Sequence, residues 1–80
     1  MSTSAVRLDP VVVDVSCTAD ALRVVLADGR EIVTPLEWFP RLRDASPAAR
    51  ANWRTIGGGI GVHWPEIDED ISVEGLLATR

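Results

Sequence analysis

Residues 21–33 read ALRVVLADGREIV, and this stretch decides the fold. Apolar side chains recur at every second position along residues 22–26, a period that is typical of a β-strand with one buried face. The pair Asp28-Gly29 tolerates the positive φ angles of a two-residue type I′ turn. The stretch therefore predicts a β-hairpin whose turn fixes four facing pairs: Ala27 with Arg30, Leu26 with Glu31, Val25 with Ile32, and Val24 with Val33.

Further strand patterns lie on both sides of this hairpin. Residues 11–17 carry valine at alternate positions, which predicts a strand before it. Residues 53–56 and 60–64 predict a second hairpin, because the glycines at 57–59 give the backbone freedom for a turn. Along the second arm we expect three apolar side chains on one buried face: Ile60, Val62 and Trp64.

Short helices are expected between and after the hairpins. Residues 36–42 have apolar side chains at helical spacing but are interrupted by Pro40, so they predict a broken helical turn. Ser46 followed by proline matches an N-cap with proline at the first helical position, which predicts a helix over 47–52.

Ser72 is the candidate N-cap of a last helix over residues 73–78. Together the patterns predict an α+β fold. Its small, mostly antiparallel sheet has about five strands, two hairpins plus an N-terminal strand, and it carries two or three short helices, the last one C-terminal.

Size and composition predict one domain over residues 1–80, with about the first five residues disordered. The chain has 80 residues, of which 46% are hydrophobic and 25% charged, the ordinary range for a globular protein. It holds a single cysteine and no apolar run near the roughly 20 residues needed to cross a bilayer. The first ten residues lack the apolar core of a signal peptide. We therefore expect a cytoplasmic protein with no membrane partner.

Four segments carry a resemblance to a known family. They are the Asp28-Gly29 turn, residues 35–42 (PLEWFPRL), residues 53–57 (WRTIG) and residues 63–77 (HWPEIDEDISVEGLL). In these the chain resembles the small bacterial proteins grouped as domain of unknown function 2442. The resemblance implies a compact α+β unit with no established activity, at times joined to a helix-turn-helix domain. It also implies genes that lie beside those of other small proteins, as in toxin–antitoxin pairs.

One imidazole and several carboxylates lie close together in residues 63–70, so a metal or ligand site centred on His63 is one hypothesis. Asp68 and Asp70 would be its other ligands. The segment lacks the cysteines or paired histidines of a zinc site and the oxygen spacing of a calcium loop. The alternative is that acidic side chains here meet the positive end of the last helix. We expect no cofactor.

No catalytic arrangement is visible in the sequence. His63 is the single histidine and has no nucleophile beside it. Cys17 lies on an apolar strand face, which predicts a buried, unreactive thiol. The glycines at 57–61 continue into a strand and lack the lysine of a phosphate-binding loop. We therefore expect a protein that is not an enzyme.

Trp38 and Arg41 form the best candidate for a binding surface, because tryptophan and arginine dominate binding hot spots. We expect Trp64 to be buried and Trp38 to be partly exposed. Residues 41–54 hold four arginines against one aspartate, whereas residues 66–74 hold five carboxylates. These regions either pair within the fold or offer patches to partners.

These patterns predict a non-catalytic protein-interaction module, half of a small bacterial regulatory pair that is antitoxin-like or a dimerisation unit. Its partner would be another small protein or a second copy. The predicted partner-binding residues are Trp38, Arg41, His63, Asp68, Glu69 and Asp70. One alternative is a nucleic-acid regulator acting through Arg41 to Arg54, although a net charge of −4 and the absence of lysine disfavour direct binding to nucleic acid. Another is a small metal- or ligand-binding protein.

Overall fold

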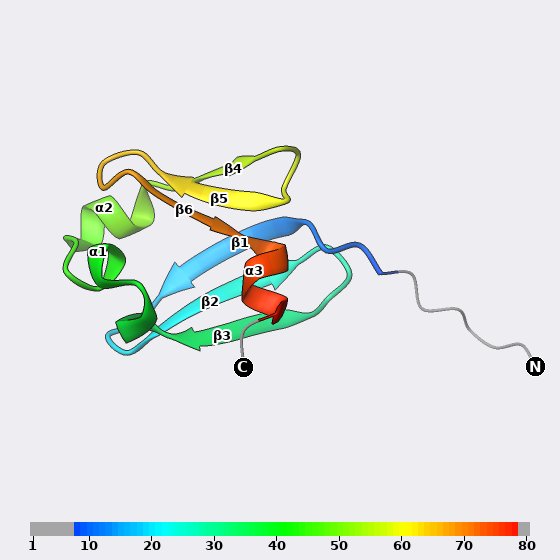
Figure 1. Ribbon diagram of the computed structural model, residues 1–80, viewed down its shortest axis with the longest axis horizontal. Helices are drawn as coiled ribbons and strands as arrows, with labels where there is room; N and C mark the ends of the chain where they lie inside the picture. The colour runs from blue at the N-terminus through cyan, green and yellow to red at the C-terminus, as the bar shows by residue number, and fades with distance from the viewer. Residues whose placement is uncertain (1–7, 79–80) are drawn as a thin grey trace, which may run out of the picture.

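The computed structural model describes residues 8–78, so the predicted disorder of residues 1–5 lies outside the described part of the chain. Its α+β character confirms the predicted class, but the strand arrangement differs. Two three-stranded antiparallel sheets lie one above the other in Figure 1, where about five strands in one sheet were expected. The first sheet holds β1 (Val12–Cys17), β2 (Ala21–Leu26) and β3 (Glu31–Pro35), in that order.

The second sheet holds β4 (Arg54–Ile56), β5 (Gly61–Trp64) and β6 (Glu69–Ser72), in that order. Strand β6 is the element that the sequence did not predict, because its first residues are acidic and seldom favour strands. Within residues 8–78, β1 meets the turn between β4 and β5 through a backbone hydrogen bond from the Val12 N–H to the Gly59 carbonyl at 2.8 Å. A single hydrogen bond does not pair two strands, so the two three-stranded sheets remain separate.

The register of the first hairpin differs from the prediction by one residue. Val24 faces Ile32 and Val25 faces Glu31. The loop has three residues, because the Leu26 N–H donates to the Arg30 carbonyl at 2.8 Å and the Gly29 N–H donates to the Leu26 carbonyl at 3.0 Å. In the described residues Gly29 has a φ of 94°, and Asp28 is not among the residues with positive φ. This is the three-residue loop that ends on a glycine in the left-handed region.

Four short helical segments connect and cap the strands. They are η1 (Leu36–Trp38), α1 (Pro40–Arg43), α2 (Pro47–Ala51) and α3 (Val73–Ala78). The break between η1 and α1 before Pro40 confirms the predicted interruption. Ser46 caps α2 by accepting the Ala49 N–H at 3.1 Å, as predicted, although α2 ends one residue earlier than expected. None of the helices in residues 8–78 has the length and apolar character that crossing a bilayer requires.

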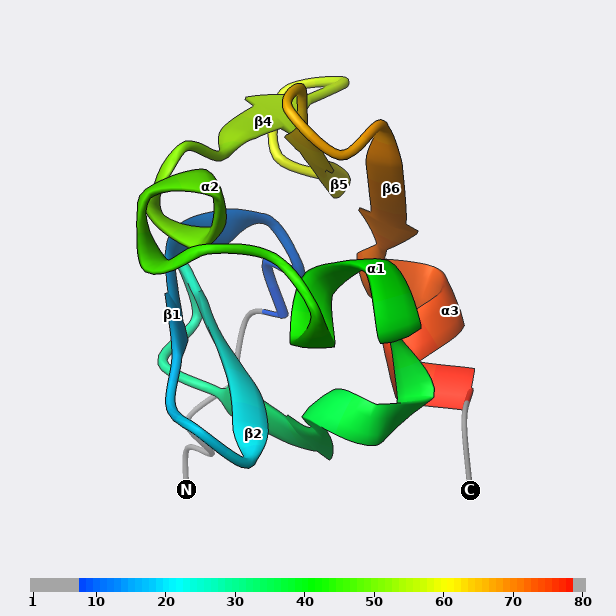
Figure 2. The same ribbon diagram turned by 90° about the vertical axis from the view of Figure 1, so that its left-hand side faces the viewer.

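The core lies between the two sheets and the helices. Figure 2 shows β1 and β2 on one side of it, and β6 with α3 on the other. Its largest fully buried side chain is Trp64, at 0% exposure, as predicted, beside Leu22, Leu26, Leu36 and Leu42. Val62 is also buried, but the prediction for Ile60 was wrong: it is 63% exposed, because β5 begins after it. Thr34 Oγ1 is buried without a hydrogen-bond partner among the described residues.

Candidate interaction site

Trp38 and Arg41 lie at the junction of η1 and α1, where the chain turns at Pro40. Trp38 is 46% exposed, as predicted. The Arg41 guanidinium donates from Nη1 to the Asp68 carbonyl at 2.9 Å, which links α1 to the turn between β5 and β6. Asp68 has a φ of 51°, a conformation that aspartate tolerates better than most residues. The link holds the Arg41 guanidinium, three residues along the chain from the exposed indole, and tryptophan and arginine are the residues that dominate binding hot spots.

His63 and Asp70 face each other across β5 and β6. His63 Nδ1 lies in hydrogen-bond contact with Asp70 Oδ1, and the two side chains are 26% and 66% exposed. Arg54 lies opposite His63 on the other side, in β4, so the three residues form one row across the outer face of the sheet. Glu69 faces Trp64 instead, on the opposite face.

Four of the six predicted site residues form two pairs, because Arg41 contacts the Asp68 carbonyl and His63 contacts Asp70. Trp38 lies three residues before Arg41 in the chain, and Glu69 faces Trp64. Of the three weak metal candidates, His63 and Asp70 come together, but the structure engages Asp68 through its carbonyl with Arg41. Within residues 8–78, no three His, Cys, Asp or Glu side chains gather closely enough to hold a metal ion.

The helix-dipole interpretation of the acidic segment was wrong for most of its members. Asp68 lies in a turn, and Glu69 and Asp70 belong to β6, so the strand separates them from the start of α3. Ser72 caps α3 by accepting the Gly75 N–H at 3.0 Å, and Glu74 is the acidic residue of the first turn. Glu69 and Asp70 belong to a strand because β5 pairs with them.

The arginines of the central segment are largely held by neighbouring groups. Arg43 pairs with Asp44 at 2.9 Å, and Arg50 donates from Nε to the Leu42 carbonyl at 2.9 Å and from Nη2 to the Arg43 carbonyl. No ion pair joins this segment to the acidic one in the described chain; their polar links are Arg41 to the Asp68 carbonyl and Asn52 to Glu66. Because these arginines lie apart and already form hydrogen bonds within the protein, they are poorly arranged to contact successive phosphates of a nucleic acid.

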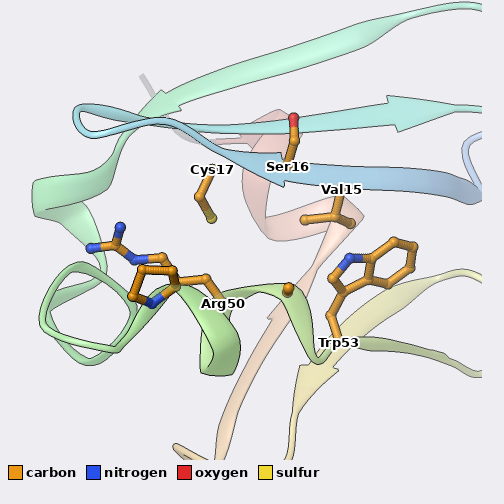
Figure 3. A pocket seen from close by; sticks show the side chains of 7 residues that line it. Val15, Ser16, Cys17, Arg50 and Trp53 are labelled. Atoms are coloured by element: carbon orange, nitrogen blue, oxygen red, sulfur yellow. The ribbon is translucent and has the colours of Figure 1, made fainter.

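A cleft that the sequence did not predict opens between β1 and α2. It measures about 300 Å³ and is lined by Val15, Ser16, Cys17, Pro47, Arg50, Ala51 and Trp53. Figure 3 shows Val15 and Cys17 pointing toward α2 and Trp53, whereas Ser16 points away. No local pattern predicted this cleft, because it depends on where α2 packs.

Cys17 was predicted to be buried, but it is only partly buried on the wall of this cleft. Burial nevertheless raises the pKa of its thiol, and the nearby Arg50 guanidinium opposes that rise. Because the thiolate is the nucleophilic form, a raised pKa makes the group less reactive.

Comparisons with known proteins agree with the fold. The chain is similar to a protein of unknown function from Rhodospirillum rubrum ATCC 11170, known from a crystal structure, with 26% identity and a TM-score of 0.70 over 85% of this chain and 84% of that one. No curated protein matches the sequence. The model of the family described as protein of unknown function (DUF2442) matches residues 12–80. The resemblance drawn from the four segments is thereby confirmed, and the chain belongs to the DUF2442 family.

Proposed function

We propose that this protein is a non-catalytic interaction module, one half of a small bacterial regulatory pair that is antitoxin-like or a dimerisation unit. The observations that support this are the exposed indole of Trp38 and, three residues later in the chain, an Arg41 guanidinium held by the Asp68 carbonyl. When a partner covers a half-exposed indole, its apolar surface is removed from water, which favours binding. A guanidinium that is already held in place loses little conformational entropy on binding.

A non-catalytic role also fits the state of the ionisable groups. His63 is engaged with Asp70, the Cys17 thiol has a raised pKa, and the carboxylates of Asp28 and Glu31 pair with arginines. A nucleophile activated by an adjacent base would need these groups to converge on one another. Here each serves a local contact.

The test is affinity capture from the native organism with three tagged baits: the wild type, Trp38→Ala and Leu77→Ala. Leu77 is the matched control, because it is 47% exposed against 46% for Trp38. We expect a stoichiometric companion, or a self-associated dimer in sedimentation equilibrium, with the wild type and Leu77→Ala. Trp38→Ala should weaken that complex by about thirtyfold, the loss typical of a hot spot.

Two results would contradict the proposal. One is a wild-type protein that is monomeric and captures no companion. The other is a companion that binds Trp38→Ala as tightly as the wild type, which would place the interface elsewhere.

A further inference from the structure

The cleft beside β1 borders a strand edge with free backbone groups. β1 lies at the edge of its sheet. The Thr18 N–H donates to the Ala21 carbonyl at 2.9 Å, which sets the alternation of the antiparallel ladder along β1. By that alternation the N–H and C=O groups of Val15 and Cys17 point away from β2. Residues 8–78 provide no backbone partner for them, whereas the Val12 N–H is bonded to Gly59.

Val15 and Cys17, whose main-chain groups point away from β2, both line the cleft. Ser16 borders it too, although its hydroxyl points to the other face of the sheet in Figure 3. Helix α2 and Trp53 form the opposite wall. An edge strand beside a helix is the arrangement in which an extended peptide adds to a sheet: main-chain hydrogen bonds provide affinity and the groove receives alternate side chains.

The positive charge of Arg50 in the lining of the cleft favours a negatively charged ligand. Among residues 8–78, Arg50 is the residue of permanent charge on the lining of the cleft, and no carboxylate lines it. Outside the cleft, Arg43 and, more weakly, Arg50 lower the pKa of the Asp44 carboxyl. The guanidinium uses Nε and Nη2 on carbonyls of α1, which holds it in place and leaves Nη1 for another acceptor. Its effect on the Cys17 thiol places the positive charge near the cleft wall. An acidic side chain is the complement of this group.

We propose that the cleft between β1 and α2 binds an extended acidic segment of a partner protein, which pairs with Val15 and Cys17 as an added strand and places a carboxylate against Arg50. The volume of about 300 Å³ admits one or two side chains, so the paired segment is short. This site goes beyond the Trp38 surface, and either can fail alone.

The test uses the full chain and three synthetic probes, acetyl-Val-Glu-Val-Glu-Val-amide and the same peptide with lysine or glutamine in place of glutamate. Binding is followed by amide chemical shifts and hydrogen exchange. We expect the Val15 and Cys17 amides to become protected and the glutamate peptide to bind about threefold to tenfold more tightly than the lysine peptide, the range for a solvent-screened charge contact. N-methylation of the central peptide bonds should abolish binding, because it removes main-chain donors.

Ala51 provides matched variants, since it is exposed, ends α2 and lines the cleft. Ala51→Glu places an anion in the cleft and should weaken the glutamate peptide by about threefold or more, whereas Ala51→Gln, of nearly equal size, should not. Trp38→Ala should leave peptide binding unchanged.

Four results would overturn the proposal. They are no binding of any probe at millimolar concentration, equal affinity for the glutamate and lysine peptides, shifts centred on Trp38 instead of β1, and Val15 and Cys17 amides that become protected with protein concentration alone. The last would make the cleft an interface between copies of this chain.

Discussion

Trp64 connects the second sheet to α2 through one side chain. Its indole is fully buried, and Nε1 donates to the Arg50 carbonyl at 3.1 Å. Trp64→Phe removes the donor of the Arg50 carbonyl and leaves a cavity beside it. We therefore expect the free energy of unfolding, measured by urea titration, to fall by about 1–3 kcal/mol. Trp38→Phe, at an exposed position, should change it by less than about 0.5 kcal/mol. Equal losses would contradict the burial of Trp64.

Asp28 makes the free energy of unfolding depend on pH in the acidic range. The Arg30 guanidinium, then the Asp9 N–H, lower the pKa of Asp28 from 3.8 to about 2. A lowered pKa in the folded state stabilises the protein above the ordinary value, and this contribution is lost as the pH falls from about 4 toward 2. We expect the urea midpoint of Asp28→Asn to fall less over that window than that of the wild type. Parallel curves for the two proteins would show that the Arg30 pair does not contribute.

At the scale of elements, the turn between β4 and β5 is shaped by its contact with β1. Gly58 and Gly59 both have positive φ, 73° and 105°. A Cβ at Gly58 meets nothing within 4 Å, but one at Gly59 would lie 2.8 Å from Val11 Cβ. Gly58→Ala should therefore cost about 1 kcal/mol of backbone strain, and Gly59→Ala should cost clearly more. Thermal unfolding of the pair measures this, and equal costs would mean that the turn does not pack on Val11.

The elements also show how far the sequence predicts the fold. Capping at Ser46 and the break at Pro40 depend on adjacent residues, so local patterns found them. The hairpin register was missed because Asp28-Gly29 is compatible with both a two-residue and a three-residue loop. In the three-residue loop of the structure, the Asp28 carboxylate accepts the Arg30 and Asp9 N–H groups. Strand β6 was missed because it exists through its pairing with β5.

The same limit applies to the candidate site. The exposure of Trp38 followed from its polar neighbours, and its nearness to Arg41 in the chain is read directly from the sequence. The contact of Arg41 with Asp68 spans 27 residues, and the cleft beside Cys17 joins β1 to α2. Such contacts depend on how elements distant in the sequence pack together, and the local periodicity of the sequence does not predict that packing.

For the molecule as a whole, the core is one connected cluster that includes residues of both sheets and of α3, among them Leu22, Val62 and Leu76. The single-domain prediction over residues 1–80 thus leads to one cooperative unfolding transition. The unfolding transition followed by far-ultraviolet circular dichroism should coincide with the one followed by tryptophan fluorescence, to which Trp38, Trp53 and Trp64 contribute. An early fluorescence change with β-structure retained would mean that the second sheet unfolds separately.

The lone hydroxyl of Thr34 has a practical consequence. Oγ1 sits in the interior without a partner in residues 8–78, so dehydrating it on folding is uncompensated. Thr34→Val keeps the branched shape and removes that penalty, and a gain of about 1 kcal/mol would raise the melting temperature by about 4–8 °C in a domain of this size. Differential scanning calorimetry would detect it. Replacing this one buried hydroxyl by a methyl group should therefore give a more heat-resistant protein, better suited to crystallisation, whose surface is unchanged.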